Sequence, residues 1–214
     1  MLVKERMSHP VISVKPDVPI MEALRLMQRE RIRRMPVIQD GKMIGIVSDK
    51  DLMHAAPSDA TSLSVWEINY LISQIRVRDV MTKDVFSVHE DTPIEEAARI
   101  MADNKIGGLP VMADGGVVGL ITETDLFKIL LELMGARENG VRVTVVVPDH
   151  PGALGQLTQA IANVGGSFIA FGQFAGEDTT NRIVTFKVTG ISEAQAREAV
   201  APVVERIVDV RTCC

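Results

Sequence analysis

The octapeptide GIVSDKDL occupies residues 45–52, and a near copy, GLITETDL, occupies residues 119–126. The offset between the two is 74 residues (45 to 119). Sliding the chain by this distance aligns residues 7–52 with residues 81–126 without a gap, and about 19 of the 46 pairs are identical. The chain therefore contains an internal duplication, and each shared residue needs a physical reason that applies twice.

Both copies show the same order of expected elements. A short apolar strand (HPVISV or DVFSV) precedes Pro19 or Pro93, which fits the first helical position because that position leaves its N–H unbonded anyway. Apolar residues then recur at helical spacing. An apolar strand (MPVIQ or LPVMA), an Asp-Gly turn and a second strand (KMIGIV or GVVGLI) predict a hairpin before a closing helix. The unit is therefore strand, helix, hairpin, helix.

This order, with Pro-Val before the hairpin and G-x-x-[ST]-x-x-D after it, resembles the CBS domain. Two copies in tandem resemble a CBS pair (Bateman module), over residues 1–134 of the chain. The resemblance implies two units related by a pseudo-twofold axis, with clefts for adenosine-containing ligands. We expect the first unit at 1–60, a connecting helix at 61–76 and the second unit at 77–134.

The pairs Ser48/Asp51 and Thr122/Asp125 have two compatible interpretations. A hydroxyl followed three residues later by an acid forms a capping box at a helix start, although such boxes normally use Glu or Gln. A carboxylate at the edge of a cleft can also accept both hydroxyls of a ribose, and a hydroxyl at a helix N-terminus helps to hold phosphate. The CBS resemblance implies the second role, with the Asp on ribose and the Ser or Thr near the sugar-phosphate.

Two further features bear on the ligand. Gly45 and Gly119 are expected to let a ligand approach the backbone closely. Arg33-Arg34 precede the Pro-Val strand in the first copy, where the second copy has two glycines, and CBS pairs often place phosphate-contacting cations at this position. The alternative for the RERIRR run is a solvated helix end.

This difference between the copies predicts different ligands. We expect the site around Asp51 to take AMP, ADP or ATP, with S-adenosylmethionine or NAD as further candidate ligands. The site around Asp125 is expected to prefer a less charged ligand or to stay empty.

The segment PSDATSLSVWEINYLISQIRV between the copies predicts a helix rather than a flexible linker. Ser62 or Ser64 can cap it, and Trp66 and Tyr70 lie on or beside it. Its apolar face is expected to comprise Val65, Ile68, Leu71, Ile72 and Ile75. We interpret it as a packing or dimer-contact helix.

After a linker at 135–140, residues 141–214 predict the order βαββαβ, a ferredoxin-like unit, so the whole chain is of the α+β class. The run DHPGAL at 149–154 resembles the D-x-P-G-x-L signature of the ACT domain, a small regulatory module that often dimerises and binds amino acids at the strand-helix turn.

An amino-acid site at this turn would use four residues. The N–H groups of Gly152, Ala153 and Leu154 can receive a carboxylate at the helix N-terminus, and Asp149 can meet an ammonium group. Against this, Phe168 stands where amino-acid-binding relatives often have a polar residue. We therefore favour a dimerising ACT unit without a ligand, and keep the amino-acid site as the alternative.

Composition excludes several classes. The chain has 214 residues, a net charge of -5 and 46% hydrophobic residues, which is typical of folded domains and argues against a nucleic-acid scaffold. Both cysteines are the last two residues, and we find no signal peptide or membrane-spanning run, so we expect a cytoplasmic protein. The four histidines lack ligand spacing, and we expect neither a metal site nor catalytic residues.

The sequence predicts a cytoplasmic regulatory protein. As the resemblance to CBS pairs implies, nucleotide binding, and in the alternative also amino-acid binding, shifts a homodimer between arrangements that an unknown protein target reads. The architecture resembles the CBS-ACT proteins of acetoin-utilisation operons. Two alternatives remain: a ligand-independent scaffold or interaction subunit of a metabolic enzyme system, and a nucleic-acid-binding regulator, for which the basic run at 29–34 would have to join other cations.

Overall fold

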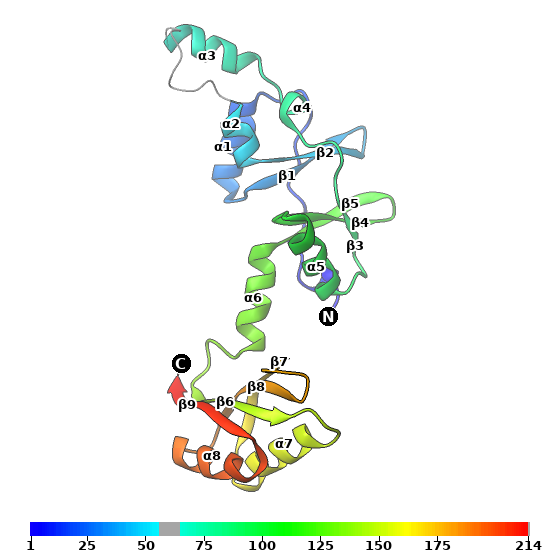
Figure 1. The fold of residues 1–214 in the computed structure, drawn as a ribbon. Helices are drawn as coiled ribbons and strands as arrows, with labels where there is room; N and C mark the ends of the chain where they lie inside the picture. Colours follow the sequence, from blue (N-terminus) through cyan, green and yellow to red (C-terminus); the bar gives the residue numbers. More distant parts are fainter. Residues whose placement is uncertain (56–64, 214) are drawn as a thin grey trace. The chain divides into compact units, whose positions relative to one another are not determined.

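The structure, a computed structural model, describes residues 1–55 and 65–213 of the chain (Figure 1). The chain divides into two compact units, Met1–Leu126 and Phe127–Cys214. The first unit contains the duplication and the second contains the ferredoxin-like fold. The predicted caps Ser62 and Ser64 lie outside the described residues.

Each copy of the duplication folds in the expected order. The first comprises α1 (Ile20–Glu30), β1 (Arg34–Gln39), β2 (Lys42–Ser48) and α2 (Asp49–His54). The second comprises β3 (Val88–His89), α5 (Ile94–Asn104), β4 (Gly108–Ala113), β5 (Gly116–Thr122) and α6 (Glu123–Leu133). Both hairpins are antiparallel, and both Asp-Gly turns have positive φ at their two residues, 50° and 78° in the first copy and 49° and 80° in the second. This is the type I′ turn that a two-residue hairpin favours.

The start of each copy differs from the prediction. HPVISV forms only an isolated bridge from Val14 to Val37, and DVFSV contributes only its last residue, Val88, to the two-residue β3. Pro19 and Pro93 are N-caps, with ψ of 141° and 140°, rather than first helical residues. At this position the proline carbonyl already accepts a helical hydrogen bond, and the missing N–H again costs nothing.

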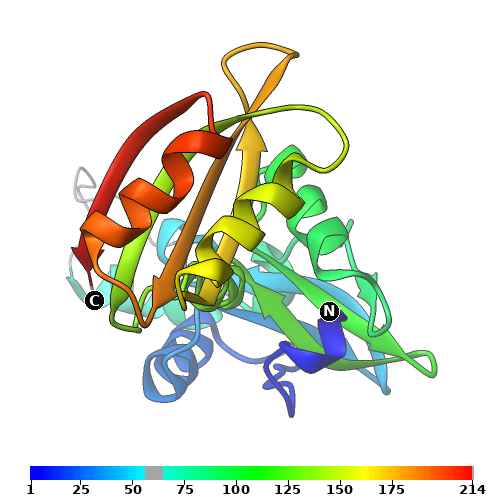
Figure 2. The same ribbon diagram turned by 90° about the horizontal axis from the view of Figure 1, so that it is seen from below.

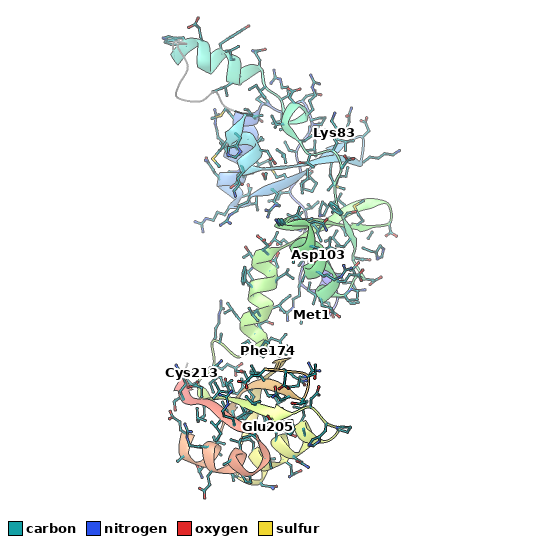
Figure 3. All side chains as sticks on the ribbon, in the orientation of Figure 1. Met1, Lys83, Asp103, Phe174, Glu205 and Cys213 are labelled. Atoms are coloured by element: carbon teal, nitrogen blue, oxygen red, sulfur yellow. The ribbon has the colours of Figure 1, made fainter. Side chains whose placement is uncertain are left out.

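The two copies exchange their first residues. The short helix η1 (Val3–Glu5) precedes the first copy but packs in the core of the second, whereas α4 (Val77–Val80) precedes the second copy and packs in the core of the first. The N–H of Ile94 donates to the carbonyl of Met1 at 3.1 Å, and Figure 3 labels Met1 near the start of α5. Neither copy therefore completes its core from its own consecutive residues.

The connecting segment forms α3 (Val65–Gln74), as the sequence predicts. Of the predicted apolar face, Ile72 and Ile75 pack against the core of the first copy, and the side chains of Val65 and Ile68 lie outside what the structure describes. The predicted member Leu71 is instead 46% exposed, and Trp66 and Tyr70 are 86% and 67% exposed. The helix therefore buries only part of its apolar surface in this chain.

The second unit has the predicted βαββαβ order. Its elements after α6 are β6 (Gly140–Pro148), α7 (Ala153–Asn163), β7 (Ser167–Ala175), β8 (Asn181–Thr189), α8 (Glu193–Val200), η2 (Ala201–Val203) and β9 (Arg206–Cys213). The strand order is β7-β8-β6-β9 with antiparallel neighbours, and α7 and α8 cover one face of this sheet (Figure 2). The core between them includes Val143, Val145, Leu157, Phe186 and Val200. The predicted α+β fold is confirmed.

On the strand β8, Lys187 is only 3% exposed. Its ammonium group donates to the carbonyls of Gly135 and Glu138, at 2.9 Å and 2.5 Å. These carbonyls follow the end of α6, so the buried lysine holds the segment between α6 and β6 against the sheet.

Among the residues that the structure describes, no helix is long and apolar enough to cross a bilayer.

Candidate functional site

The first octapeptide places Ser48 at the end of β2 and Asp51 in the first turn of α2. The N–H and Oγ of Ser48 both donate to Asp51 Oδ2, at 2.8 Å and 2.7 Å, and the N–H of Asp51 donates back to Ser48 Oγ at 3.3 Å. This is a complete capping box with Asp in the place of the usual Glu. Asp51 Oδ1 accepts no hydrogen bond from the described residues. One carboxylate oxygen thus caps the helix and the other is available to a ligand.

The second octapeptide has the same geometry. The N–H and Oγ1 of Thr122 donate to Asp125 Oδ2, at 3.1 Å and 2.7 Å. Asp125 is only 6% exposed, whereas Asp51 is half-buried. The two acids therefore have equivalent local partners but differ in their access to solvent.

The two predicted cations lie in different places. Arg33 is exposed, and its carbonyl accepts the N–H of Asp49 at 3.0 Å. The side chain of Arg34 is half-buried, and its Nη1 donates to the carbonyl of Gly107 at 2.6 Å, in the second copy. The guanidinium of Arg34 thus lies against the second copy while its backbone adjoins the first cap, and the assignment of both arginines to the site around Asp51 stays a prediction.

Gly45 and Gly119 are tightly surrounded by the exchanged segments. A Cβ on Gly45 would lie 2.7 Å from Met81 Sδ and 2.8 Å from the carbonyl oxygen of Thr82. A Cβ on Gly119 would collide in the same way with Met7, the equivalent of Met81. The close approach that these glycines permit is thus made by the other copy's first residues, which corrects the expectation that a ligand fills this space.

At the strand-helix turn of the second unit, most of the residues of the predicted amino-acid site already have a partner or pack within the chain. Gly152 is the N-cap of α7 with φ of +92°, and Ala153 is buried behind it. Asp149 forms an ion pair with Arg182, whose Nε and Nη2 lie 2.9 Å and 2.8 Å from Asp149 Oδ2. An ammonium group would therefore have to compete with Arg182 for this carboxylate. Leu154 is half-buried and packs against the core.

The remaining aromatic residue of the prediction, Phe168, lies in a cluster with Phe171 and Phe186, with ring centroids 5.2 to 6.3 Å apart. It packs against the core under the helices. At this position the chain therefore has an aromatic ring packed against the core and no polar side chain.

The sequence analysis missed Glu123, the first residue of α6. A Cβ on Gly107 would lie 2.8 Å from Glu123 Oε2 and would also meet Arg34 Nη2. An arginine, an acid and a backbone carbonyl therefore adjoin the same small space beside the second cap. The sequence contains a signal for this acid, because Asp49 and Glu123 occupy the same position of the two octapeptides.

Comparison with known families supports this description. Residues 3–58 and 77–132 match the CBS domain, and residues 139–211 match the TTHA0829-like ACT domain. The two CBS matches together cover more than half of the chain. The chain spans 46% of the length of a curated relative from Methanocaldococcus jannaschii that is 29% identical over 135 residues.

Solved structures resemble the chain over about three fifths of its length. The CBS domain pair of protein MJ0100, in complex with 5′-methylthioadenosine and S-adenosyl-L-methionine, is 27% identical with a TM-score of 0.52, covering 64% of this chain and 98% of that one. CBSX2 in complex with AMP is 30% identical with a TM-score of 0.52, covering 62% and 97%. The AcuB protein of Vibrio cholerae, whose name refers to acetoin utilization, is 30% identical with a TM-score of 0.53, covering 64% and 95%.

Proposed function

We infer the function from the family, since the chain belongs to the CBS domain family, as a tandem CBS pair followed by a TTHA0829-like ACT domain. CBS and ACT domains are regulatory modules, and related CBS pairs bind AMP, S-adenosylmethionine and methylthioadenosine. We propose that this chain is a cytoplasmic regulatory protein that binds an adenine nucleotide in its CBS pair. We propose no catalytic residues and no metal.

The observation that carries the proposal is the free half of the Asp51 carboxylate. Its Oδ2 completes the cap of α2, while Oδ1 has no partner among the described residues and belongs to a half-buried side chain. A ribose diol can donate to such an oxygen without breaking the cap. The equivalent Asp125 offers a second, less accessible position.

The experiment is a calorimetric titration of AMP, ADP, ATP, S-adenosylmethionine and NAD into the purified protein, repeated with Asp51→Ala and Asp125→Ala. We expect micromolar binding of at least one of these compounds, weakened more than tenfold when the acid of its site is removed. Absence of heat with every compound would contradict the proposal and leave the octapeptides as helix caps.

We propose that ligand state is transmitted through a homodimer to a protein target. Trp66 and Tyr70 stand four residues apart on α3 and are both largely exposed, which is typical of a helix face that another protein covers. Sedimentation of the wild type and of Trp66→Ser tests this: a dimer that weakens in the variant supports it, and a wild-type monomer at micromolar concentration contradicts it.

A second candidate function is an interaction subunit of a metabolic enzyme system. The similarity to AcuB favours a system for acetoin utilization.

For the ACT domain we propose a dimerising role rather than amino-acid binding, because Arg182 already pairs with Asp149. A thermal-shift screen of the twenty amino acids tests this point, and a stabilisation lost in Asp149→Ala would overturn it.

A further inference from the structure

Arg34 reaches from one candidate site to the other. Its backbone stands opposite Ser48 in the β1–β2 hairpin, next to the first cap. Its guanidinium donates to the carbonyl of Gly107 at 2.6 Å, next to the second cap. A Cβ on Gly108 would lie 3.2 Å from Arg34 Cδ and 3.3 Å from the Thr122 methyl carbon Cγ2, so the Arg34 side chain runs along the β4–β5 hairpin near Thr122.

The duplication departs from its symmetry where this arginine lies. The second copy has Gly107 and Gly108 at the positions of Arg33 and Arg34, and even a methyl group on Gly107 would meet the Arg34 guanidinium. An arginine in both copies would place two like-charged groups in the same space. The two glycines therefore make room beside the second cap for the guanidinium of a residue whose backbone adjoins the first.

We propose that Arg34 is a cation shared by the two candidate nucleotide sites, so that a phosphate bound at one site withdraws it from the other. This inference rests on the proposed function. The carbonyl of Gly107 holds the guanidinium when no phosphate is present, and a phosphate replaces this neutral acceptor with a charged, bidentate one. Glu123, on the other side of the same space, disfavours a second phosphate that lacks the arginine.

The consequence is negative coupling between the sites that depends on ligand charge. Two molecules of AMP compete for Arg34, whereas two molecules of 5′-methylthioadenosine, which has no phosphate, do not. Intrinsic differences between the sites affect both ligands, so the ratio of the two dissociation constants must be larger for AMP than for methylthioadenosine.

The test is calorimetric titration of AMP and of methylthioadenosine into wild type, Arg34→Met and the control Arg25→Met, an exposed arginine of α1 outside both candidate sites. In wild type we expect the second AMP to bind at least tenfold more weakly, relative to the first, than the second methylthioadenosine. Because a hydrogen bond to a charged group is worth about one to two orders of magnitude in affinity, Arg34→Met should weaken the first AMP by about ten- to a hundredfold, and remove this excess. Arg25→Met should retain it.

A second variant perturbs the position of Arg34 without removing its charge. Gly107→Ala pushes the guanidinium away from its carbonyl acceptor and should reduce the excess coupling without weakening methylthioadenosine binding. Three results would overturn the proposal of a shared cation. They are equal coupling for AMP and methylthioadenosine, a single binding site for both ligands, and equal weakening of both ligands by Arg34→Met. Binding of neither ligand to the wild type would instead contradict the proposed function itself.

Discussion

Val3 and Val77 occupy equivalent positions of the duplication, and each is fully buried in the core of the other copy. Val3 packs with residues of β4, β5 and α5, and Val77 packs with residues of α1, β1 and β2. Since each copy supplies a part of its partner's core, the two cannot separate without exposing apolar surface. Each core therefore depends on a segment that precedes the other copy.

Exchanging either valine for alanine should loosen the opposite copy. Val3→Ala removes buried methyl groups from the second core, at a cost of about 2 kcal/mol, and Val77→Ala does the same to the first. Hydrogen exchange should show lost protection mainly at 88–121 in Val3→Ala and mainly at 14–52 in Val77→Ala. Loss in the variant's own copy would argue against the exchange of segments.

The contact of Gly45 with the other copy predicts a steric cost. Gly45→Ala places a Cβ 2.8 Å from the backbone oxygen of Thr82, which cannot move as easily as a side-chain end, so we expect destabilisation of about 1–3 kcal/mol. Gly116→Ala is the matched control, because the atom nearest to its Cβ would be 3.9 Å away. Denaturant unfolding of both variants checks this, and equal stability of the two would refute it.

An exposed ion pair marks the exchanged segment. Lys4 Nζ lies 2.6 Å from Asp91 Oδ1, and this hydrogen bond lowers the pKa of Asp91 and raises that of Lys4. A lowered carboxylate pKa favours folding above its unfolded value, and this contribution is lost as pH falls through the folded value. We expect an NMR titration to place the Asp91 pKa below its usual range in the wild type and to return it toward that range in Lys4→Met. An unchanged pKa would show that the pair does not form in solution.

The buried Lys187 should matter for the stability of the ACT domain. Lys187→Met removes two charge-assisted hydrogen bonds, to the carbonyls of Gly135 and Glu138, and a hydrogen bond to a charged group is worth about 1.5–3 kcal/mol. Arg197→Met, on the exposed part of α8, is the control. Thermal unfolding should separate the two variants, with a lowered midpoint only in Lys187→Met. Equal midpoints would contradict a stabilising role of Lys187.

Much of the fold follows from the sequence because its signals are local. The Asp-Gly turns, the helical spacing after Pro19 and the capping pair Ser48/Asp51 each depend on a few consecutive residues, and each forms as predicted apart from one-residue shifts at helix starts. The βαββαβ order is read in the same way. Because of the 74-residue repeat, each element of the pair could be predicted from two aligned segments instead of one.

What the sequence did not reveal is pairing between distant segments. An apolar residue such as Val3 is suited to a core, but the sequence does not say which of the two cores it enters. The same holds for Gly45, whose close neighbour is Met81, and for Arg34, whose acceptor lies in the second copy. A ligand and a neighbouring chain segment both demand glycine, so the residue alone cannot distinguish them.

The central claim, that the octapeptide acids bind an adenine nucleotide as well as capping helices, is tested most directly by Asp51→Glu combined with Asp125→Glu. Because a capping box normally uses Glu, this double variant should keep both caps and its thermal midpoint, while the shifted carboxylates should weaken AMP binding more than tenfold. Calorimetry and thermal unfolding measured together decide it. Unchanged AMP affinity in the double variant, or loss of affinity only in proportion to lost stability, would contradict the account.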